Sequence, residues 1–229
     1  MALYVIGDLH LSFGCDKPMD VFGGRWENYI DKLRDGFSTV RPEDTTVLCG
    51  DLSWGMSLAD ALEDFRFIHE LPGRKIILKG NHDYWWTTAG QAYRFFAENG
   101  FDDLEILNNN CLLYGETALC GTRGWTCETA ASGEHDRKMQ RRELMRLEAS
   151  LKAAGDREKL VFLHYPPKLL TNEWTEAIDL MCAYHVCRCW YGHLHGPGCA
   201  QAFEGEYRGV RFQLVSADHV HFIPQKIFR

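Results

Sequence analysis

Five short apolar runs in this chain each stop at residues that a protein core excludes. In the clearest case, the run at residues 75–78 leads into Gly80, followed by an amide, an imidazole and a carboxylate. Such polar groups are rarely buried unless they are paired. One such ending is typical of a polar turn, but five in one chain favour a shared site. The endings are Asp8-Leu9-His10, Gly50-Asp51, Asn81-His82-Asp83, His164 and His193-Leu194-His195.

The spacing within these endings turns their side chains to a common side. In an extended chain, residues i and i+2 point the same way. Asp8 and His10 therefore face one direction together, as do His193 and His195. Ligand sites in α/β sheets gather at the carboxyl ends of strands. We therefore expect the five endings to meet at one edge of the fold.

The order of the apolar runs predicts an α/β fold. Over the first hundred residues, runs of strand length alternate with segments of helical spacing. The short runs at 104–107, 111–114 and 118–120 favour antiparallel strands, and residues 134–154 favour a long charged helix. Alternation at Val210, Phe212 and Leu214, and again at Val220 and Phe222, is typical of a hairpin. We expect two packed sheets with helices outside, in a single domain of residues 1–229.

The charge of the chain argues against a general nucleic-acid or anionic-membrane surface. Lys and Arg total 25 and Asp and Glu total 32, a formal net charge of −7. No apolar run approaches the roughly 18 residues of a membrane span. Residues 1–6 are too short for a signal peptide and lack its basic start. These features predict a cytoplasmic protein without a membrane span, and they leave its oligomeric state open.

The cysteines do not form an obvious structural zinc site. The chain has 9 of them, mostly scattered. The tightest group is Cys182, Cys187, Cys189 and Cys199, whose spacings differ from the C-x₂₋₄-C pairs of such sites. Strand residues that face alternate sides account better for Cys187 and Cys189.

The strand endings together offer seven ligands for divalent metals of intermediate softness. Carboxylate and amide oxygens and imidazole nitrogens are present, without thiolate. Seven ligands exceed one tetrahedral centre and suit two metals that share a bridging carboxylate. Two divalent ions against two carboxylates leave a pocket of about +2, which matches a phosphate-bearing substrate. The candidate ligands are Asp8, His10, Asp51, Asn81, His164, His193 and His195.

With these blocks in this order, the chain resembles the calcineurin-like metallophosphoesterase superfamily. The resemblance spans residues 8–195 and implies an α/β fold, a four-layer αββα sandwich, with two metal ions such as Mn, Fe or Zn. It is strongest to small bacterial predicted phosphohydrolases, through the loop at residues 8–24 and the block Gly121-Thr122-Arg123-Gly124-Trp125.

The resemblance also implies a role for each residue. The first metal would take Asp8, His10, Asp51 and His195. The second would take Asp51, Asn81, His164 and His193, so that Asp51 is the bridge. His82, beside the metals, would protonate the leaving-group oxygen or stabilise charge on the phosphoryl group.

One block departs from the protein serine/threonine phosphatases of the superfamily. Their GDxxDRG motif supplies a carboxylate that orients the catalytic histidine and an arginine for phosphate, and residues 50–56 of this chain lack both. Asp83 is a candidate to orient either its turn or His82. Arg123 is the best substitute phosphate ligand, because a guanidinium between two glycines could bind phosphate in a bidentate way. The alternative is a surface contact in a hairpin turn.

The resulting hypothesis is a dinuclear-metal phosphoesterase acting on a small mono- or diester. A water or hydroxide that bridges the metals would attack phosphorus while His82 assists the leaving group. One alternative is an inactive metal-binding scaffold, although the chain retains every ligand. Another is a nuclease, although outside residues 137–146 the chain has no tract rich in Lys and Arg. That basic run is either a solvated helix face or a cap on the active site.

Overall fold

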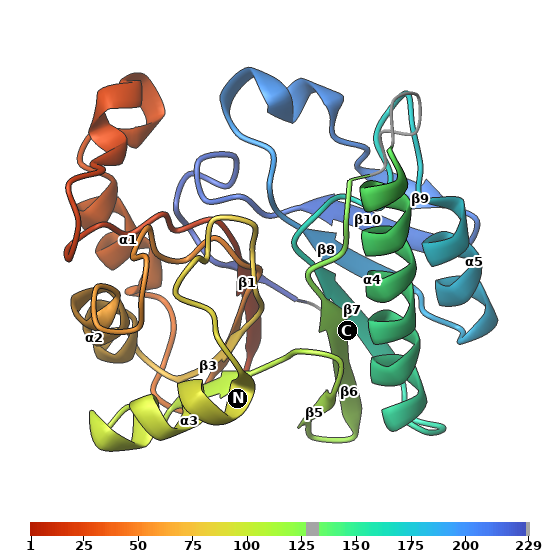
Figure 1. The fold of residues 1–229 in the computed structure, drawn as a ribbon, viewed down its shortest axis with the longest axis horizontal. Coiled ribbons are helices and arrows are strands. Elements are labelled where there is room, and N and C mark those ends of the chain that lie inside the picture. The colour runs from red at the N-terminus through yellow and green to blue at the C-terminus, as the bar shows by residue number, and fades with distance from the viewer. Residues whose placement is uncertain (127–132, 228–229) are drawn as a thin grey trace.

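The chain builds two mixed β-sheets that pack face to face (Figure 1). The computed structural model describes residues 1–126 and 133–227. The first sheet has the order β11-β1-β2-β3-β4 and the second β5-β6-β7-β8-β10-β9. The strands of the first are β1 (Leu3–Ile6), β2 (Thr45–Leu48), β3 (Arg74–Ile77), β4 (Leu104–Ile106) and β11 (Gln225–Lys226). Those of the second are β5 (Cys111–Tyr114), β6 (Thr117–Thr122), β7 (Lys159–Leu163), β8 (Arg188–Tyr191), β9 (Gly205–Tyr207) and β10 (Val210–Leu214).

Helices cover the outer face of each sheet, which completes a four-layer αββα sandwich. Three lie against the first sheet: α1 (Tyr29–Phe37), α2 (Leu62–Glu70) and α3 (Ala89–Glu98). Two lie against the second: α4 (Glu134–Ala153) and α5 (Thr175–Ala183). Short 3₁₀ helices occur at Met19–Phe22, Gly24–Trp26 and Gly196–Gln201. No helix in residues 1–126 or 133–227 is both long and apolar enough to cross a membrane.

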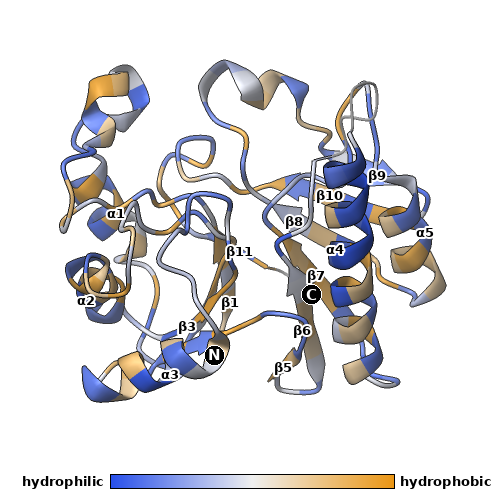
Figure 2. Cartoon of the chain, viewed as in Figure 1, coloured by the Kyte–Doolittle hydropathy of each residue, from blue (hydrophilic) through white to orange (hydrophobic). Residues whose placement is uncertain are grey.

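The central strands read as continuous apolar runs because both of their faces are buried. In β1, Tyr4 and Ile6 pack under the helices, whereas Leu3 and Val5 face the other sheet. The layer between the sheets is apolar and includes Phe162 on β7, stacked on Trp190 of β8 with ring centroids 5.2 Å apart. Figure 2 shows β1 and β7 as mostly hydrophobic, in contrast to the hydrophilic amino-terminal half of α4.

Two local predictions are wrong. β4 was expected to be antiparallel, but it pairs parallel to β3, because α3 carries the chain back across the sheet as a crossover connection. The alternation at Val220 and Phe222 lies in turns, not in a strand. Phe222 is buried there because its ring packs against Trp26, at 5.3 Å between centroids. The hairpin that involves β10 is instead formed with β9.

Replacement of Phe162 by alanine tests the apolar layer between the sheets. Phe162 is fully buried, so Phe162→Ala should lower the free energy of unfolding by about 3–5 kcal/mol. Urea denaturation followed by circular dichroism measures this change. The matched control is Leu170→Ala, at a side chain that is 62% exposed. Equal stability of the two variants would contradict the packing described.

Candidate metal centre

The five predicted strand endings meet at the carboxyl edge of the two sheets. Backbone hydrogen bonds join them, from the Asp8 N–H to the Gly50 carbonyl at 2.8 Å and from the Gly192 N–H to the His164 carbonyl at 3.0 Å. Several of the predicted ligand residues, which follow the strands, have a left-handed backbone conformation, including Asp8 at φ 60° and Asp51 at φ 52°. Such conformations are costly for residues other than glycine and cluster at functional sites.

The first group of side chains consists of Asp8, His10 and His195, with one potential ligand atom from each within 4.8 Å of the others. His195 Nε2 lies 3.5 Å from Asp8 Oδ1 and 3.1 Å from His10 Nε2. Asp8 and His10 follow β1 in the first sheet, whereas His195 follows β8 in the second. The group therefore draws on both sheets.

The second group consists of Asp51, His164 and His193. His164 Nε2 lies 3.5 Å from Asp51 Oδ2. The Asn81 side-chain oxygen joins this group, at 2.7 Å from His164 Nε2 and 2.9 Å from His193 Nδ1. This group also draws on both sheets.

Asp51 lies between the two groups. Its Oδ2 atom is 3.8 Å from His10 Nε2 in the first group and 3.5 Å from His164 Nε2 in the second. A carboxylate in that position can bind two cations at once. The bridging role expected of Asp51 stays a prediction.

Hydrogen bonds outside the groups turn the histidine lone pairs inward. His164 Nδ1 lies 3.0 Å from the Cys49 carbonyl, which can only accept, so this nitrogen carries the proton. His195 Nδ1 likewise lies 3.0 Å from Asp218 Oδ1. The Nε2 atoms of the two rings face Asp8 Oδ1 and Asn81 Oδ1. Burial acts to lower the pKa of His195, but Asp8 and Asp218 outweigh it and raise this pKa to about 10, so a cation bound here would displace a proton. Acceptors that face one another in a buried site fit a cation between them, and an outer carboxylate of this kind is typical of metal-bound histidine.

Burial and mutual charge shift the pKa values of these groups. Burial raises the pKa of Asp51 to about 7, against the opposing effect of His164. Burial and the neighbouring His164 lower the pKa of His193 to about 3. Burial also acts to raise the pKa of Asp8, but His195 outweighs it and the net shift is downward. A metal ion would compete with the proton on Asp51, because a ligand must be deprotonated to bind.

Two glycines let the carboxylates rest directly on the backbone. A Cβ atom at Gly80 would lie 2.0 Å from Asp51 Oδ1, and one at Gly192 would lie 2.3 Å from Asp8 Oδ2. Any larger residue at either position would push a carboxylate out of its group. The glycines that precede Asn81 and His193 are therefore part of the construction of the site.

Asp83 holds the turns of the site together. Its carboxylate accepts hydrogen bonds from the N–H groups of Asp51 at 2.9 Å, Leu52 at 2.8 Å and Gly80 at 2.6 Å. It also accepts from the Ser53 N–H and the Trp85 indole. Asp83 was a candidate to orient either its turn or His82. These hydrogen bonds show that it orients the turn, and other residues contact the His82 ring.

His82 lies beside the two groups and belongs to neither. Its backbone N–H donates to Asp51 Oδ1 at 2.7 Å. Its ring packs against Trp54, with centroids 4.5 Å apart, and lies 5.8 Å from the ring of His10. Burial and the nearby His164 lower the pKa of His82. Aromatic packing, together with Tyr84 Oη at 3.4 Å from Nδ1, therefore orients the ring.

Trp54 and Asp218 are the two contributors that the sequence analysis missed. Asp218 accepts from the Gly196 N–H at 2.8 Å as well as from His195. The signal for Asp218 was present, because it follows the apolar run of β10 in the way that the other site residues follow theirs. Trp54 follows Asp51 closely, but its position over His82 depends on the fold.

Arg123 lies at the carboxyl end of β6, next to the second ligand group. Its carbonyl accepts from the His164 N–H at 3.1 Å. Its guanidinium lies over the Trp125 ring, 4.6 Å from the centroid, and 3.6 Å from Glu143 Oε1. The alternative of a surface contact in a hairpin turn is wrong, because β6 continues towards α4 and the Arg123 side chain is only 14% exposed.

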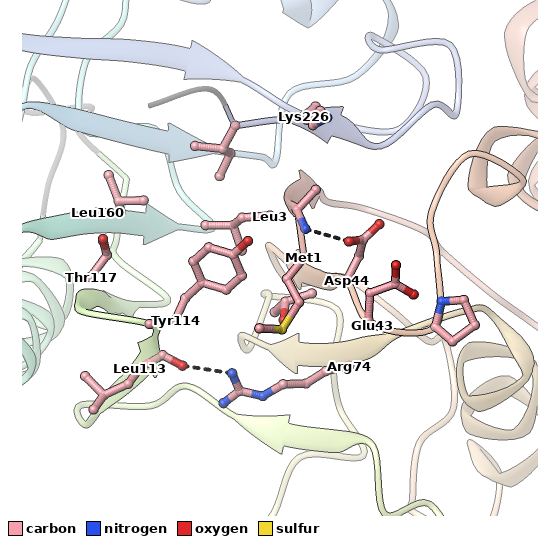
Figure 3. Close-up of a pocket in the computed structure, with 15 residues that line it drawn as sticks. Met1, Leu3, Glu43, Asp44, Arg74, Leu113, Tyr114, Thr117, Leu160 and Lys226 are labelled. Carbon is pink, nitrogen blue, oxygen red and sulfur yellow. Dashed lines mark hydrogen bonds between the residues drawn. The ribbon is translucent and has the colours of Figure 1, made fainter.

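A cavity lies at the opposite end of the sheets, near the strand starts (Figure 3). It measures about 790 Å³, and no histidine lines it. Its polar groups pair with one another: Arg74 donates to the Leu113 carbonyl at 2.9 Å, and the Ala2 N–H donates to Asp44. This cavity therefore contains none of the candidate ligands, which lie at the carboxyl edge.

Residues 1–197 match the family of calcineurin-like phosphoesterases. No curated protein matches the chain significantly. Among solved structures, the protein of unknown function AQ665 from Aquifex aeolicus is similar over 98% of this chain and 95% of its own, with 17% identity and a TM-score of 0.53. A second crystal structure is similar over 92% of this chain and 88% of its own, with 13% identity and a TM-score of 0.59. These two likenesses show a shared fold.

The Asp83 carboxylate provides a test of how the site is held. Asp83→Ala leaves several buried N–H groups without an acceptor, so it should lower the free energy of unfolding by about 3 kcal/mol or more. It should also reduce the metal content after reconstitution, measured by elemental analysis. The control is Asp102→Ala, at an exposed carboxylate. Unchanged stability and metal content in Asp83→Ala would contradict the role given to this residue.

Proposed function

Because the chain belongs to the calcineurin-like phosphoesterase family, we propose that it hydrolyses phosphate mono- or diesters with two divalent metal ions. One observation carries the proposal: two groups of ligands lie side by side and Asp51 reaches both. Nitrogen and oxygen donors of this kind suit Mn, Fe, Zn or similar ions. When bound, such a pair of ions would neutralise charge on the phosphoryl group and activate water.

We assign the ligands of each ion from these distances. The first ion would be held by Asp8, His10, Asp51 and His195, and the second by Asp51, Asn81, His164 and His193. Asn81 contributes a neutral oxygen, which leaves the site more cationic than a carboxylate would. That surplus of positive charge favours an anionic substrate.

We propose that His82 acts on the substrate directly. Its ring lies next to the first ligand group and is half-buried against Trp54. A protonated imidazole in this position can donate a proton to the leaving-group oxygen, or a hydrogen bond to the phosphoryl oxygens. Arg123, from the neighbouring loop, would bind substrate by charge.

The direct test is turnover by the reconstituted protein. We expect hydrolysis of p-nitrophenyl phosphate or bis(p-nitrophenyl) phosphate after loading with Mn²⁺, Co²⁺, Ni²⁺, Fe²⁺ or Zn²⁺, and loss of activity on chelation. Asp51→Ala should lose both bound metal and activity. A folded protein that binds two ions per chain but turns over no ester in a broad panel would instead support the inactive scaffold.

His82→Asn separates a catalytic role from a ligand role. We expect normal metal content and a fall in kcat of about 10²–10⁴-fold, because a general acid contributes on that order. The control is His221→Asn, at an exposed histidine whose backbone φ of 55° asparagine also tolerates. Loss of metal together with activity in His82→Asn would show that this side chain is a ligand.

A further inference from the structure

A cluster of positive side chains lies where helix α4 packs on β6, beside the second ligand group. The cationic cluster consists of Arg123 and Arg146, which share Glu143, and of Lys79, which precedes the candidate ligand Asn81 by two residues. Glu143 on α4, which is fully buried, holds the two arginines: its Oε1 lies 2.5 Å from Arg146 Nη1 and 3.6 Å from Arg123 Nη2. Its Oε2 accepts a hydrogen bond from the Thr122 hydroxyl at 2.6 Å.

The cationic cluster has more positive charge than its carboxylates balance. In the part of the chain that the structure describes, Lys79 makes no salt bridge, and its ammonium lies over the Trp86 ring at 6.0 Å from the centroid. The Nε atom of Arg123 is buried and has no hydrogen-bond partner among the described residues. A donor left in that state is costly unless a ligand satisfies it.

The pKa shifts of Lys79 and Arg123 are consistent with this excess of positive charge. Burial lowers the pKa of Lys79, and Arg123 and Arg146 act in the same direction. Burial also lowers the pKa of Arg123, with Arg146 and Arg142 adding to the shift against the opposing Glu143. Of the acidic groups that face these cations, Glu143 is engaged by both arginines. Asp83 has both oxygens occupied by N–H groups.

The cationic cluster is continuous with the metal centre. Lys79 is separated from Asn81 only by Gly80, and the Arg123 carbonyl accepts from the Tyr165 N–H at 2.9 Å. The Tyr165 ring lies 4.3 Å from that of His193 and 5.7 Å from that of Trp125. These two aromatic rings connect the second ligand group to the guanidinium of Arg123. The cationic cluster is therefore next to the second ligand group.

We propose that the cationic cluster binds a second phosphate group of the substrate, so that the preferred ester carries a phosphate other than the one hydrolysed. This inference rests on the proposed function, because it describes the substrate of the same site. A phosphate monoester carries about −1.5 to −2 charges at neutral pH and three acceptor oxygens. Guanidinium groups bind it through paired N–H donors, and Lys79 adds a point charge. A carboxylate would offer one charge and two oxygens.

The basic residues of α4 lie in two different environments. Arg146 enters the cationic cluster and is partly buried, whereas Arg142 is exposed. Arg141 and Lys138 are exposed. One side of the helix thus helps to form the site and another is a solvated face.

Binding of non-hydrolysable ligands tests the proposal without turnover. Calorimetric titration of the metal-loaded protein would compare propylphosphonate, 3-phosphonopropionate and 1,3-propylenebisphosphonate. We expect the bisphosphonate to bind at least about ten-fold more tightly than the monophosphonate, since each charge-assisted hydrogen bond is worth that much or more. Lys79→Gln and Arg146→Gln should each reduce this difference in affinity between the two ligands, whereas Arg141→Gln should preserve it.

The outcomes are distinct. The proposal would be overturned if the wild-type protein bound the bisphosphonate and the monophosphonate equally well. It would also be overturned if the difference in affinity persisted in a Lys79→Gln/Arg146→Gln double variant. Equal or tighter binding of the phosphonopropionate would overturn the assignment of a phosphate. Metal content measured after titration identifies a bisphosphonate that merely strips metal, which would also count against it. Lys79→Gln removes no salt bridge among the described residues, so it keeps the test valid if Arg146→Gln fails to fold. Absence of turnover alone would refute the phosphoesterase activity and leave the binding result standing.

Discussion

The Asp83 carboxylate is the interaction on which the rest of the site depends. Its two oxygens collect N–H groups from the turn after β2 and from the turn after β3. A buried carboxylate with that many donors fixes two loops at once, because each N–H would otherwise lack an acceptor. Asp51 and Asn81, which we propose as the bridging ligand and a neutral ligand, lie on these loops. A residue outside both ligand groups therefore sets the geometry of residues within them.

An acidic protein can offer a cationic site because charge is arranged locally. The net charge of −7 is spread over the chain, whereas Lys79, Arg123 and Arg146 converge beside the ligand groups. Low-dielectric surroundings strengthen each of these charges relative to the same charge in water. The fully buried Glu143 keeps the two arginines together without cancelling them. An excess of acidic residues over the whole chain is therefore compatible with an excess of basic side chains in the cationic cluster.

The sequence predicted the strand endings well because their signal is local. An apolar run that stops at Asp, Asn or His identifies both a strand and its carboxyl end, and the family pattern then supplied the αββα order. The parallel pairing of β4 depends on which sheet the chain rejoins, which a three-residue strand does not encode. The buried turn at Val220 has the same alternation as a strand. The contact of Arg123 with Glu143 joins residues that only the fold brings together, so the sequence could not show that Arg123 is enclosed.

Each ligand group takes side chains from both sheets, and this has a consequence for how the protein unfolds. The layer between the sheets is held mainly by apolar packing, which is not directional. An ion coordinated from both sides would act as a cross-link at the carboxyl edge, where that layer ends. Because such an ion binds the folded chain and not the unfolded one, folding stability would rise with the free metal concentration. The metal ions would then contribute to the free energy of unfolding of the protein as well as to its chemistry.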